Sequence, residues 1–288
     1  MRIISQQIRD GWPIPVIIPV ADSEDEITKK CLDNLRSCTN LPLSVYLVES
    51  SGSEFTYGKS MNAGIKAARP ADFFIGMDSD AFPRQGAIDA LVDYSHQDPR
   101  IGYVGVKVFT EENEPNLAWV NRGFIGFAWS CLTAGAPFYA LRRLSKGNWY
   151  SLPPKGISHL KPGRMTGIVS TMFLLRKHCY DEIGPFDERF QGSWADVDYS
   201  YRVLTSDRWF VSSCPTAEVF HKCHITQLIT RDPREFEDMN DFIQKWPKER
   251  MRAVQRSARE GKFIVHRKER RAKVSPELSG LEEWYSGV

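Results

Sequence analysis

Apolar segments of strand length alternate with segments of helical periodicity along the first 110 residues. Val16-Ile17-Ile18 is typical of a buried strand, and after it Ile27, Cys31 and Leu35 recur every four positions, as on one face of a helix. Further strand-like runs lie at 43–48, 72–77 and 101–108, with helix-like segments at 59–68 and 88–92. This alternation predicts an α/β fold, a mostly parallel sheet flanked by helices.

The regular alternation stops near residue 110. Tryptophan, phenylalanine and tyrosine accumulate without periodicity from 110 to 165, which predicts an ordered, loop-rich insertion with a functional role. Strand and helix signals return over 166–224, and a basic helical extension is expected at 225–288. In that extension, Asp232 and Pro233 predict the start of a helix. The face expected to pack on the body of the protein consists of Phe236, Met239, Ile243 and Trp246.

The composition is that of an ordinary globular protein, with 42% hydrophobic and 26% charged residues in a chain of 288. The most apolar N-terminal run, 14–20, is too short to span a membrane and contains two prolines. The apolar stretch 117–141 is interrupted by polar residues, and is better suited to resting on a membrane or covering a cleft. Six cysteines without a secretory signal indicate reduced thiols. We expect a cytoplasmic protein without a transmembrane segment, with peripheral membrane contact as the alternative.

Two carboxylates follow the strand-like segment 73–77, in the sequence Asp78-Ser79-Asp80. Ligands of open α/β sheets bind beyond the carboxyl ends of the strands. Carboxylate oxygens there suit Mg²⁺ or Mn²⁺ bridging the phosphates of a nucleotide. His221, after another strand-like segment, would complete such a site with Asp80. The simpler interpretations are a polar turn and a structural histidine. A zinc site built with neighbouring cysteines has no common zinc spacing.

Two further acidic positions are candidates for chemistry. Glu49 ends the second strand before a run of small residues, where a carboxylate can accept a hydrogen bond from the imide N–H of a base; the alternative is a strand that ends in a turn. Asp196 lies where a helix is expected to begin, and there it can act as a general base. Alternatively, Ser193 and Asp196 form a capping box. Asp198 and Arg202 have the spacing of an ordinary helical ion pair.

The order and spacing of these features resemble glycosyltransferase family 2 across residues 14–224. Asp78-Ser79-Asp80 is similar to the metal motif of that family, and His221 falls on its downstream metal-associated histidine. The other similar segments are Val16–Val20, Gly58–Ile65, Thr166–Arg176, Ile183–Phe190 and Ala195–Asp198.

The resemblance implies a GT-A-type, Rossmann-like domain over 1–224 that inverts the sugar's anomeric configuration. In it, Asp78 would contact a nucleotide sugar, Asp80 and His221 would bind Mn²⁺ or Mg²⁺, and Asp196 would deprotonate the acceptor. Residues 14–109 would form the nucleotide-sugar-binding half and 166–224 the acceptor half. Further expected donor contacts are Pro19, Ala21, Glu49, Lys59, Asn62 and Ser79, and expected acceptor-side residues are Thr166, Gly167, Trp194 and Ala195.

Some positions depart from the family pattern. Ala21 stands where an aromatic residue is usual and Glu49 where aspartate is usual, and both bear on recognition of the base, for which UDP is our expectation. Ala195 replaces a usual glutamate, although the following aspartate is kept. The Gln-x-x-Arg-Trp signature of processive members is absent at 227–231, which favours transfer of one sugar per encounter.

The acceptor stays open at this stage. A glycan or lipid-linked glycan suits the aromatic segment, whereas the basic stretch 248–273, with eleven Lys or Arg against three Glu, suggests hydroxymethylated bases of viral DNA. A protein acceptor is a third alternative. Two alternatives have no glycosyltransferase activity. One is a catalytically inactive protein that binds a sugar nucleotide. The other is a nucleotidyltransferase, although such an enzyme needs a Gly-rich, Arg-bearing loop that residues 21–24 lack.

Overall fold

The computed structural model describes residues 1–50, 52, 55–68, 70–109, 163–164, 167–168, 170–191, 194–206, 208–222, 234–247, 249–251 and 253–254. The expected aromatic insertion, apart from 163–164, lies outside these residues, as does most of the basic stretch 248–273. The helix start expected at Asp232 and Pro233 also lies outside them. All structural statements below concern the described residues.

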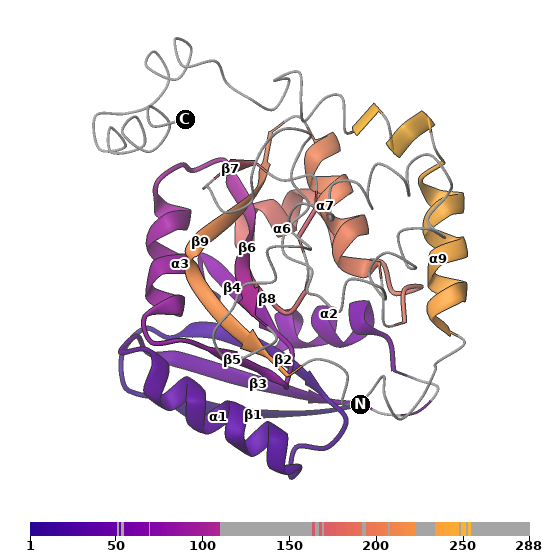
Figure 1. Ribbon diagram of the computed structural model, residues 1–288. Helices are drawn as coiled ribbons and strands as arrows, with labels where there is room; N and C mark the ends of the chain where they lie inside the picture. Colours follow the sequence, from indigo (N-terminus) through magenta and orange to yellow (C-terminus); the bar gives the residue numbers. More distant parts are fainter. Residues whose placement is uncertain are drawn as a thin grey trace.

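A nine-stranded sheet forms the centre of the molecule (Figure 1), with the strand order β1-β3-β2-β4-β8-β6-β9-β5 and with β7 paired to β9 beside that path. The strands are β1 (Arg2–Ile8), β2 (Ile14–Val20), β3 (Leu43–Glu49), β4 (Phe73–Met77), β5 (Ala81–Pro83), β6 (Ile101–Phe109), β7 (Gly163–Arg164), β8 (Met172–Arg176) and β9 (Phe210–His221).

The sheet is mixed, which corrects the expectation of a mostly parallel sheet. Only β2–β3, β2–β4 and β6–β9 pair in parallel. The pairs β1–β3, β4–β8, β6–β8, β5–β9 and β7–β9 are antiparallel. The alternation of strands and helices in the first 110 residues indicated the parallel core around β2. It carried no information on β8, which inserts antiparallel between β4 and β6.

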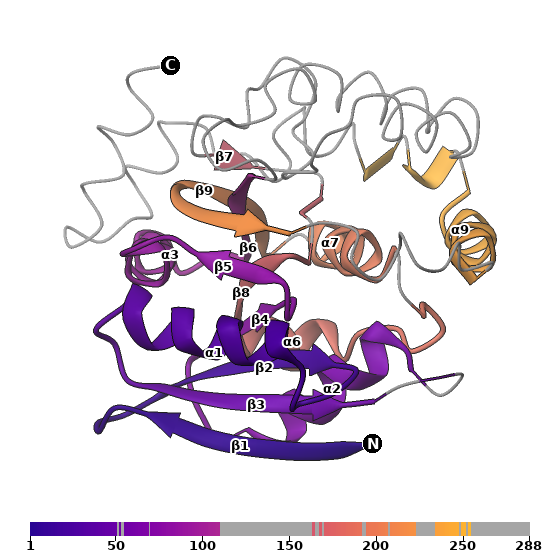
Figure 2. The same ribbon diagram turned by 60° about the horizontal axis from the view of Figure 1, so that its bottom comes forward.

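Helices cover both faces of the sheet (Figures 1 and 2). They are α1 (Glu26–Cys38), α2 (Tyr57–Ala67), α3 (Ala87–His96), α6 (Lys177–Ile183), α7 (Ala195–Thr205) and α9 (Arg234–Lys245). In both views α3 lies on one side of β6 and β9, and α7, with α9 outside it, lies on the other. Among the described helices, none combines the length and the apolarity that crossing a bilayer requires.

The central strands are buried on both faces. Every residue of β4 is buried, and β2 and β3 are mostly buried, as their continuous apolar runs predict. Helix α2 approaches β2 and β3 closely at Gly64, where a Cβ atom would lie 2.4 Å from Ile17 Cγ2 and 3.0 Å from Val48 Cγ2. Val20, the last residue of β2, pairs with Glu49, the last residue of β3. The register of β2 with β4, in which Ile17 pairs with Gly76, places Val20 level with Ser79. The carboxyl ends of β2, β3 and β4 therefore meet at one edge of the sheet.

Three elements differ from their expected form. The sequence predicted no strand at 2–8, but β1 pairs along its whole length with β3. The two short strands expected at 209–211 and 217–220 are one strand, β9, that bends where its register with β6 shifts. Trp246, which directly follows α9, is buried as expected, whereas Ile243 is half-buried and the buried residue of α9 beside it is Phe242. The side chains of Phe236 and Met239 lie outside the described part.

Candidate active site

The acidic motif after β4 and the histidine at the end of β9 meet in space. The chain passes from β4 through Asp78 and Asp80 directly into β5, and β5 pairs with β9 so that Ala81 lies opposite His221. The Nε2 atom of His221 is 3.0 Å from Asp80 Oδ1 and 3.7 Å from Asp78 Oδ2. One ligand atom from each of the three side chains lies within 4.8 Å of the others. The expected convergence of Asp80 and His221, 141 positions apart, is therefore present.

These three side chains form a donor set that fits a divalent cation. Two carboxylates and one imidazole are ligands that Mn²⁺ accepts, and Mg²⁺ favours the oxygens. The side chains of Asp78, Asp80 and His221 are 28%, 19% and 17% exposed, so the site is partly buried and still reaches solvent. Exposed acidic clusters are common without a metal, but a half-buried cluster with an imidazole among its ligands is more specific.

The electrostatics of the cluster favour bound positive charge. Burial raises the pKa of Asp78 to about 7; His221 opposes this shift, and the negative charges of Asp80 and Asp196 add to it. A carboxyl group with a pKa of about 7 is only partly ionised at neutral pH, and a nearby cation would favour its ionised form. Asp196 lies near the cluster, because its carboxylate accepts from the Ser170 amide and the next residue, Thr171, contacts both Asp78 and His221.

Thr171, which the sequence analysis did not single out, holds two members of the cluster. Its hydroxyl is 3.4 Å from Nδ1 of His221, and its carbonyl oxygen accepts a hydrogen bond of 3.0 Å from the Asp78 amide. A partner on Nδ1 orients the ring so that Nε2 faces the cation site. Thr171 precedes β8, and because its contacts are with distant residues, no local sequence signal marks it.

Asp196 lies at the start of α7, and its carboxylate is fixed by backbone amides. Its Oδ2 accepts a hydrogen bond of 2.9 Å from the Ser170 amide, and its Oδ1 accepts one of 2.7 Å from the Val197 amide. The carboxylate is bonded to backbone amides, but the residue that caps α7 is Trp194, and Ser193, the other member of the expected capping box, lies outside the described residues. These two bonds hold the carboxylate at the start of α7, the position where a general base was expected.

The expected ion pair between Asp198 and Arg202 is only a minor contact. Arg202 Nε is 3.8 Å from Asp198 Oδ2. Asp198 is fully buried, and its close partners are Lys245, the last residue of α9, and Trp246, which follows it. A spacing of four residues predicted a partner on the same helix, whereas the packing of α9 supplied nearer ones.

On the nucleotide side, Glu49 lies at the carboxyl end of β3. Its Oε2 atom is 3.7 Å from Nη1 of Arg2, the residue opposite it on β1. The same oxygen is buried and has no hydrogen-bond partner among the described residues. A buried acceptor without a hydrogen bond is costly unless a ligand supplies the donor. Glu49 therefore fits a ligand N–H, and Arg2 is an added candidate beside it.

The remaining donor-side residues lie around this edge. Pro19 and Ser79 are half-buried, whereas Ala21 and Lys59 are exposed. The amide of Asn62 binds another part of the chain, because it donates to the carbonyl of Phe186 and to Glu188 and accepts from the Phe186 amide. It thus fastens α2 to the segment before α7. Its expected contact with a nucleotide sugar stays a prediction.

The expected acceptor-side residues are described in part. Gly167, Trp194 and Ala195 are buried, and Thr166 lies outside the described residues. Trp194 has the left-handed backbone conformation, with φ of 66°, immediately before α7. A tryptophan seldom adopts that conformation, so the surrounding packing must hold it.

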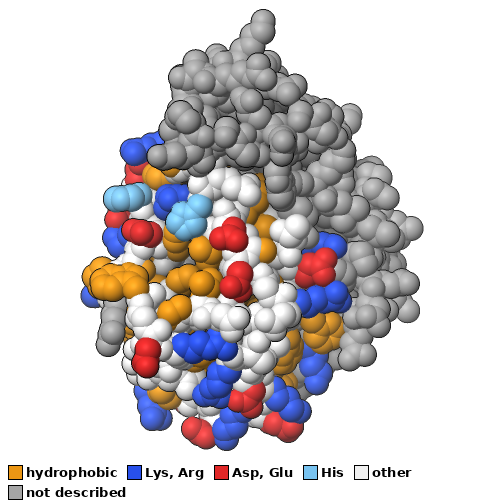
Figure 3. Space-filling view, turned by 90° about the vertical axis from the view of Figure 1, so that its left-hand side faces the viewer, with side chains coloured by type: hydrophobic (Ala, Val, Ile, Leu, Met, Phe, Trp, Pro, Cys, Tyr) orange, Lys and Arg blue, Asp and Glu red, His pale blue; other side chains and the backbone are white. Residues whose placement is uncertain are grey.

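One face of the molecule carries charges of both signs. On the face that Figure 3 shows, Lys and Arg side chains are interspersed with Asp and Glu, without an extended area of one sign. The basic stretch that suggested a nucleic acid partner is described only at 249–251 and 253–254. The described residues on this face therefore offer no basic surface for a nucleic acid.

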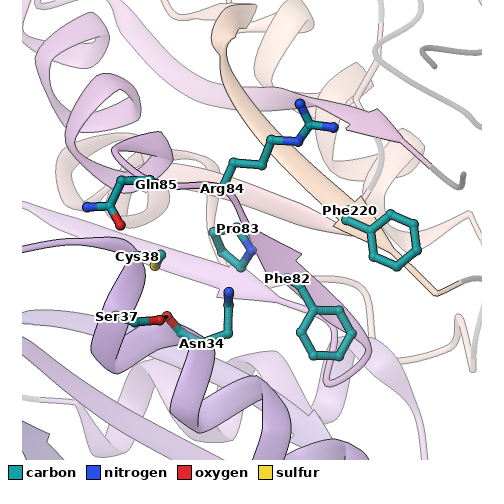
Figure 4. A pocket seen from close by; sticks show the side chains of 8 residues that line it. All are labelled: Asn34, Ser37, Cys38, Phe82, Pro83, Arg84, Gln85 and Phe220. Carbon is teal, nitrogen blue, oxygen red and sulfur yellow. Dashed lines mark hydrogen bonds between the residues drawn. The ribbon is translucent and has the colours of Figure 1, made fainter. Parts of the chain in front are cut away.

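A separate cavity of about 340 Å³ lies between α1 and the β5–β9 pair (Figure 4). Phe82 and Phe220, which are cross-strand partners, line it together with Asn34 and Arg84. Alternate residues of a strand point to opposite faces. Since His221 follows Phe220 directly, this cavity is on the opposite face of the β5–β9 pair from the acidic cluster, and it is not the candidate site.

Comparison with known proteins identifies a family and a shared fold. The family model described as glycosyl transferase family 2 matches residues 3–184. The O-antigen biosynthesis protein RfbC of Myxococcus xanthus is 31% identical over 136 residues, which are 47% of this chain and 10% of that protein. The chain therefore spans only a small part of this relative's length.

Solved structures of low sequence identity share the fold. A crystal structure of GalNAc-T7 with UDP, GalNAc and Mn²⁺ aligns with 96% of this chain and 54% of its own, at a TM-score of 0.51 and 13% identity. The crystal structure of S. aureus TarS aligns with 92% of this chain and 46% of its own, at a TM-score of 0.50 and 14% identity. This likeness confirms the expected GT-A fold, and the chain spans about half the length of both structures.

Proposed function

Because the chain belongs to glycosyl transferase family 2, we propose that it transfers one sugar from a nucleotide-sugar donor to an acceptor hydroxyl, with inversion at the anomeric carbon. The observation that carries the proposal is the convergence of Asp78, Asp80 and His221 at the carboxyl ends of the strands, with Asp196 nearby. A half-buried acidic cluster of this kind suits a diphosphate that arrives with a divalent cation.

The donor is proposed to be a UDP-sugar. Asp80 and His221 would hold the cation, and Asp78 would face both the cation and the nucleotide. Glu49, with its buried Oε2, would accept the imide N–H of the base. The GalNAc-T7 structure, which shares the fold, contains UDP and Mn²⁺ and supports this choice.

In the proposed reaction, the acceptor oxygen attacks the anomeric carbon from the face opposite the phosphate. The new carbon–oxygen bond forms as the bond from the anomeric carbon to the phosphate oxygen breaks, and the departing nucleoside diphosphate takes the electron pair. Asp196 accepts the acceptor's proton, held in position by the Ser170 and Val197 amides. A bound cation supplies electrostatic stabilisation of the negative charge on the departing diphosphate.

The acceptor is proposed to be a hydroxyl of a glycan or lipid-linked glycan. The name of the curated relative, an O-antigen biosynthesis protein, supports a glycan acceptor. The hydroxymethylated-DNA alternative depends on 248–273, most of which is outside the described residues, so no described feature favours it.

The test begins with donor binding. Thermal unfolding is followed with UDP- and GDP-sugars, each with and without Mn²⁺; a ligand at 100 times its Kd stabilises by about 2.7 kcal/mol. We expect a UDP-sugar to raise Tm only with Mn²⁺. Asp196→Asn should then bind the donor normally and lose transfer by at least about 100-fold. Transfer by this variant at the wild-type rate would show that Asp196 is not the base.

A further inference from the structure

Helices α7 and α9 both lie beyond the segment 3–184 that the family model matches, and the end of α9 contacts the first turns of α7. The Asp198 carboxylate, fully buried, lies 2.8 and 2.9 Å from Lys245 Nζ through its two oxygens. It also accepts a hydrogen bond of 2.7 Å from Trp246 Nε1. A buried carboxylate requires such partners, because an unpaired charge in the interior is strongly unfavourable. The position of α7 is therefore linked to the end of α9.

The same helix also holds the segment that leads into α7. Lys245 Nζ lies 2.6 Å from Asp187 Oδ2, and Asp238 Oδ1 accepts a hydrogen bond of 2.8 Å from the Gln191 amide. Gln191 in turn accepts, through its carbonyl, a bond of 2.8 Å from the Tyr57 amide of α2. The segment is thereby fixed between α2 and α9 on its way to Asp196.

A third contact supports the strained residue before α7. The Phe242 ring lies 4.6 Å from the Trp194 ring, at an interplanar angle of 33°, and 5.7 Å from Tyr201. Trp246 packs edge-on against Tyr201 at 5.1 Å. Trp194, in its left-handed conformation, precedes Asp196 by two residues, so a change in its backbone would redirect the Asp196 side chain.

We propose that α9 positions the catalytic carboxylate: Trp246 and Lys245, through Asp198, and Phe242, through Trp194, hold the start of α7 so that Asp196 faces the acceptor. This inference rests on the proposed role of Asp196 as the base. The contacts of α9 given above are with α7 and with the segment that leads into it, and α9 acts on Asp196 through these two parts.

The test is Trp246→Phe, which keeps an aromatic ring against Tyr201 and removes the N–H that Asp198 accepts. The expected result is a fall in kcat of about 10- to 100-fold, because small misplacements of catalytic groups cost this much. The Kd of the UDP-sugar with Mn²⁺ should stay within twofold. The matched control is Trp209→Phe, since Trp209 is also buried and its Nε1 has no hydrogen-bond partner among the described residues.

A pair of substitutions at Lys245 provides a second measurement that does not depend on the folding of the tryptophan variant. Lys245→Arg retains a positive donor for Asp198 and should keep at least a third of kcat, whereas Lys245→Met should lose kcat like Trp246→Phe. The inference is overturned if Trp246→Phe and Lys245→Met transfer at the wild-type rate, or if donor affinity falls in parallel with kcat. A wild-type protein that neither binds nor transfers a UDP-sugar would instead refute the proposed function.

Discussion

Replacing Asp78 by asparagine is expected to stabilise the protein against unfolding at pH 7.5 when no divalent cation is present. The reason is that burial, reinforced by Asp80 and Asp196, raises the pKa of Asp78 to about 7 in the folded protein. The same group titrates near about 3.9 in an unfolded chain. As pH rises from about 4 to 7, the unfolded chain releases this proton first. Stability therefore falls across that window and stays low above it.

The size of the effect follows from the two pKa values. A shift of roughly three units corresponds to about 4 kcal/mol, at about 1.4 kcal/mol per unit. Because the Asp78 side chain is 28% exposed, water screens part of this penalty, and we expect about 2 kcal/mol. Asparagine carries no charge at any of these pH values, so the variant avoids the penalty.

Urea unfolding in EDTA at pH 5 and pH 7.5 measures the difference directly. Asp78→Asn should be more stable than wild type by about 2 kcal/mol at pH 7.5 and by less than half of that at pH 5. Asp10→Asn, at an exposed position, serves as the control and should change little at either pH. The reasoning is refuted if Asp78→Asn is the less stable protein at pH 7.5, or if its advantage is the same at both values.

Two further predictions concern residues outside the motifs. Thr171→Val should weaken Mn²⁺ binding in the presence of UDP by about tenfold, because loss of a partner for a histidine ligand typically costs 10- to 100-fold in affinity; Thr171→Ser keeps the hydroxyl 3.4 Å from His221 and should bind nearly normally. Titration followed by electron paramagnetic resonance measures the Mn²⁺ affinity, and equal affinities of the two variants would contradict the role of the Thr171 hydroxyl. Gly76→Ala should lower the free energy of unfolding by about 1–3 kcal/mol, since a Cβ at position 76 would lie 2.1 Å from Phe173 Cζ. Urea unfolding measures this change in stability. Gly52→Ala serves as the comparison, because an alanine at position 52 would be strained by the φ of 71° but its Cβ would meet no neighbouring atom.

Several parts of the fold and site could be predicted from the sequence because they depend on local pattern. Continuous apolar runs indicated β2, β3 and β4, because strands buried on both faces need apolar side chains throughout. Acidic residues directly after such strands indicated the site, since carboxyl ends of parallel strands meet at one edge. Asp78 and Asp80 are therefore marked by their immediate neighbours in the chain.

Only the tertiary structure decided which distant residues meet. The mostly exposed strand β1 has no continuous apolar run that would predict it, and the antiparallel entry of β8 depends on packing with β4 and β6. His221 reaches Asp80 through the register of β9 with β5, and Asp198 finds its partners 47 and 48 positions away. A local pattern reports how each residue is buried, whereas register and long-range partners depend on how whole elements pack together.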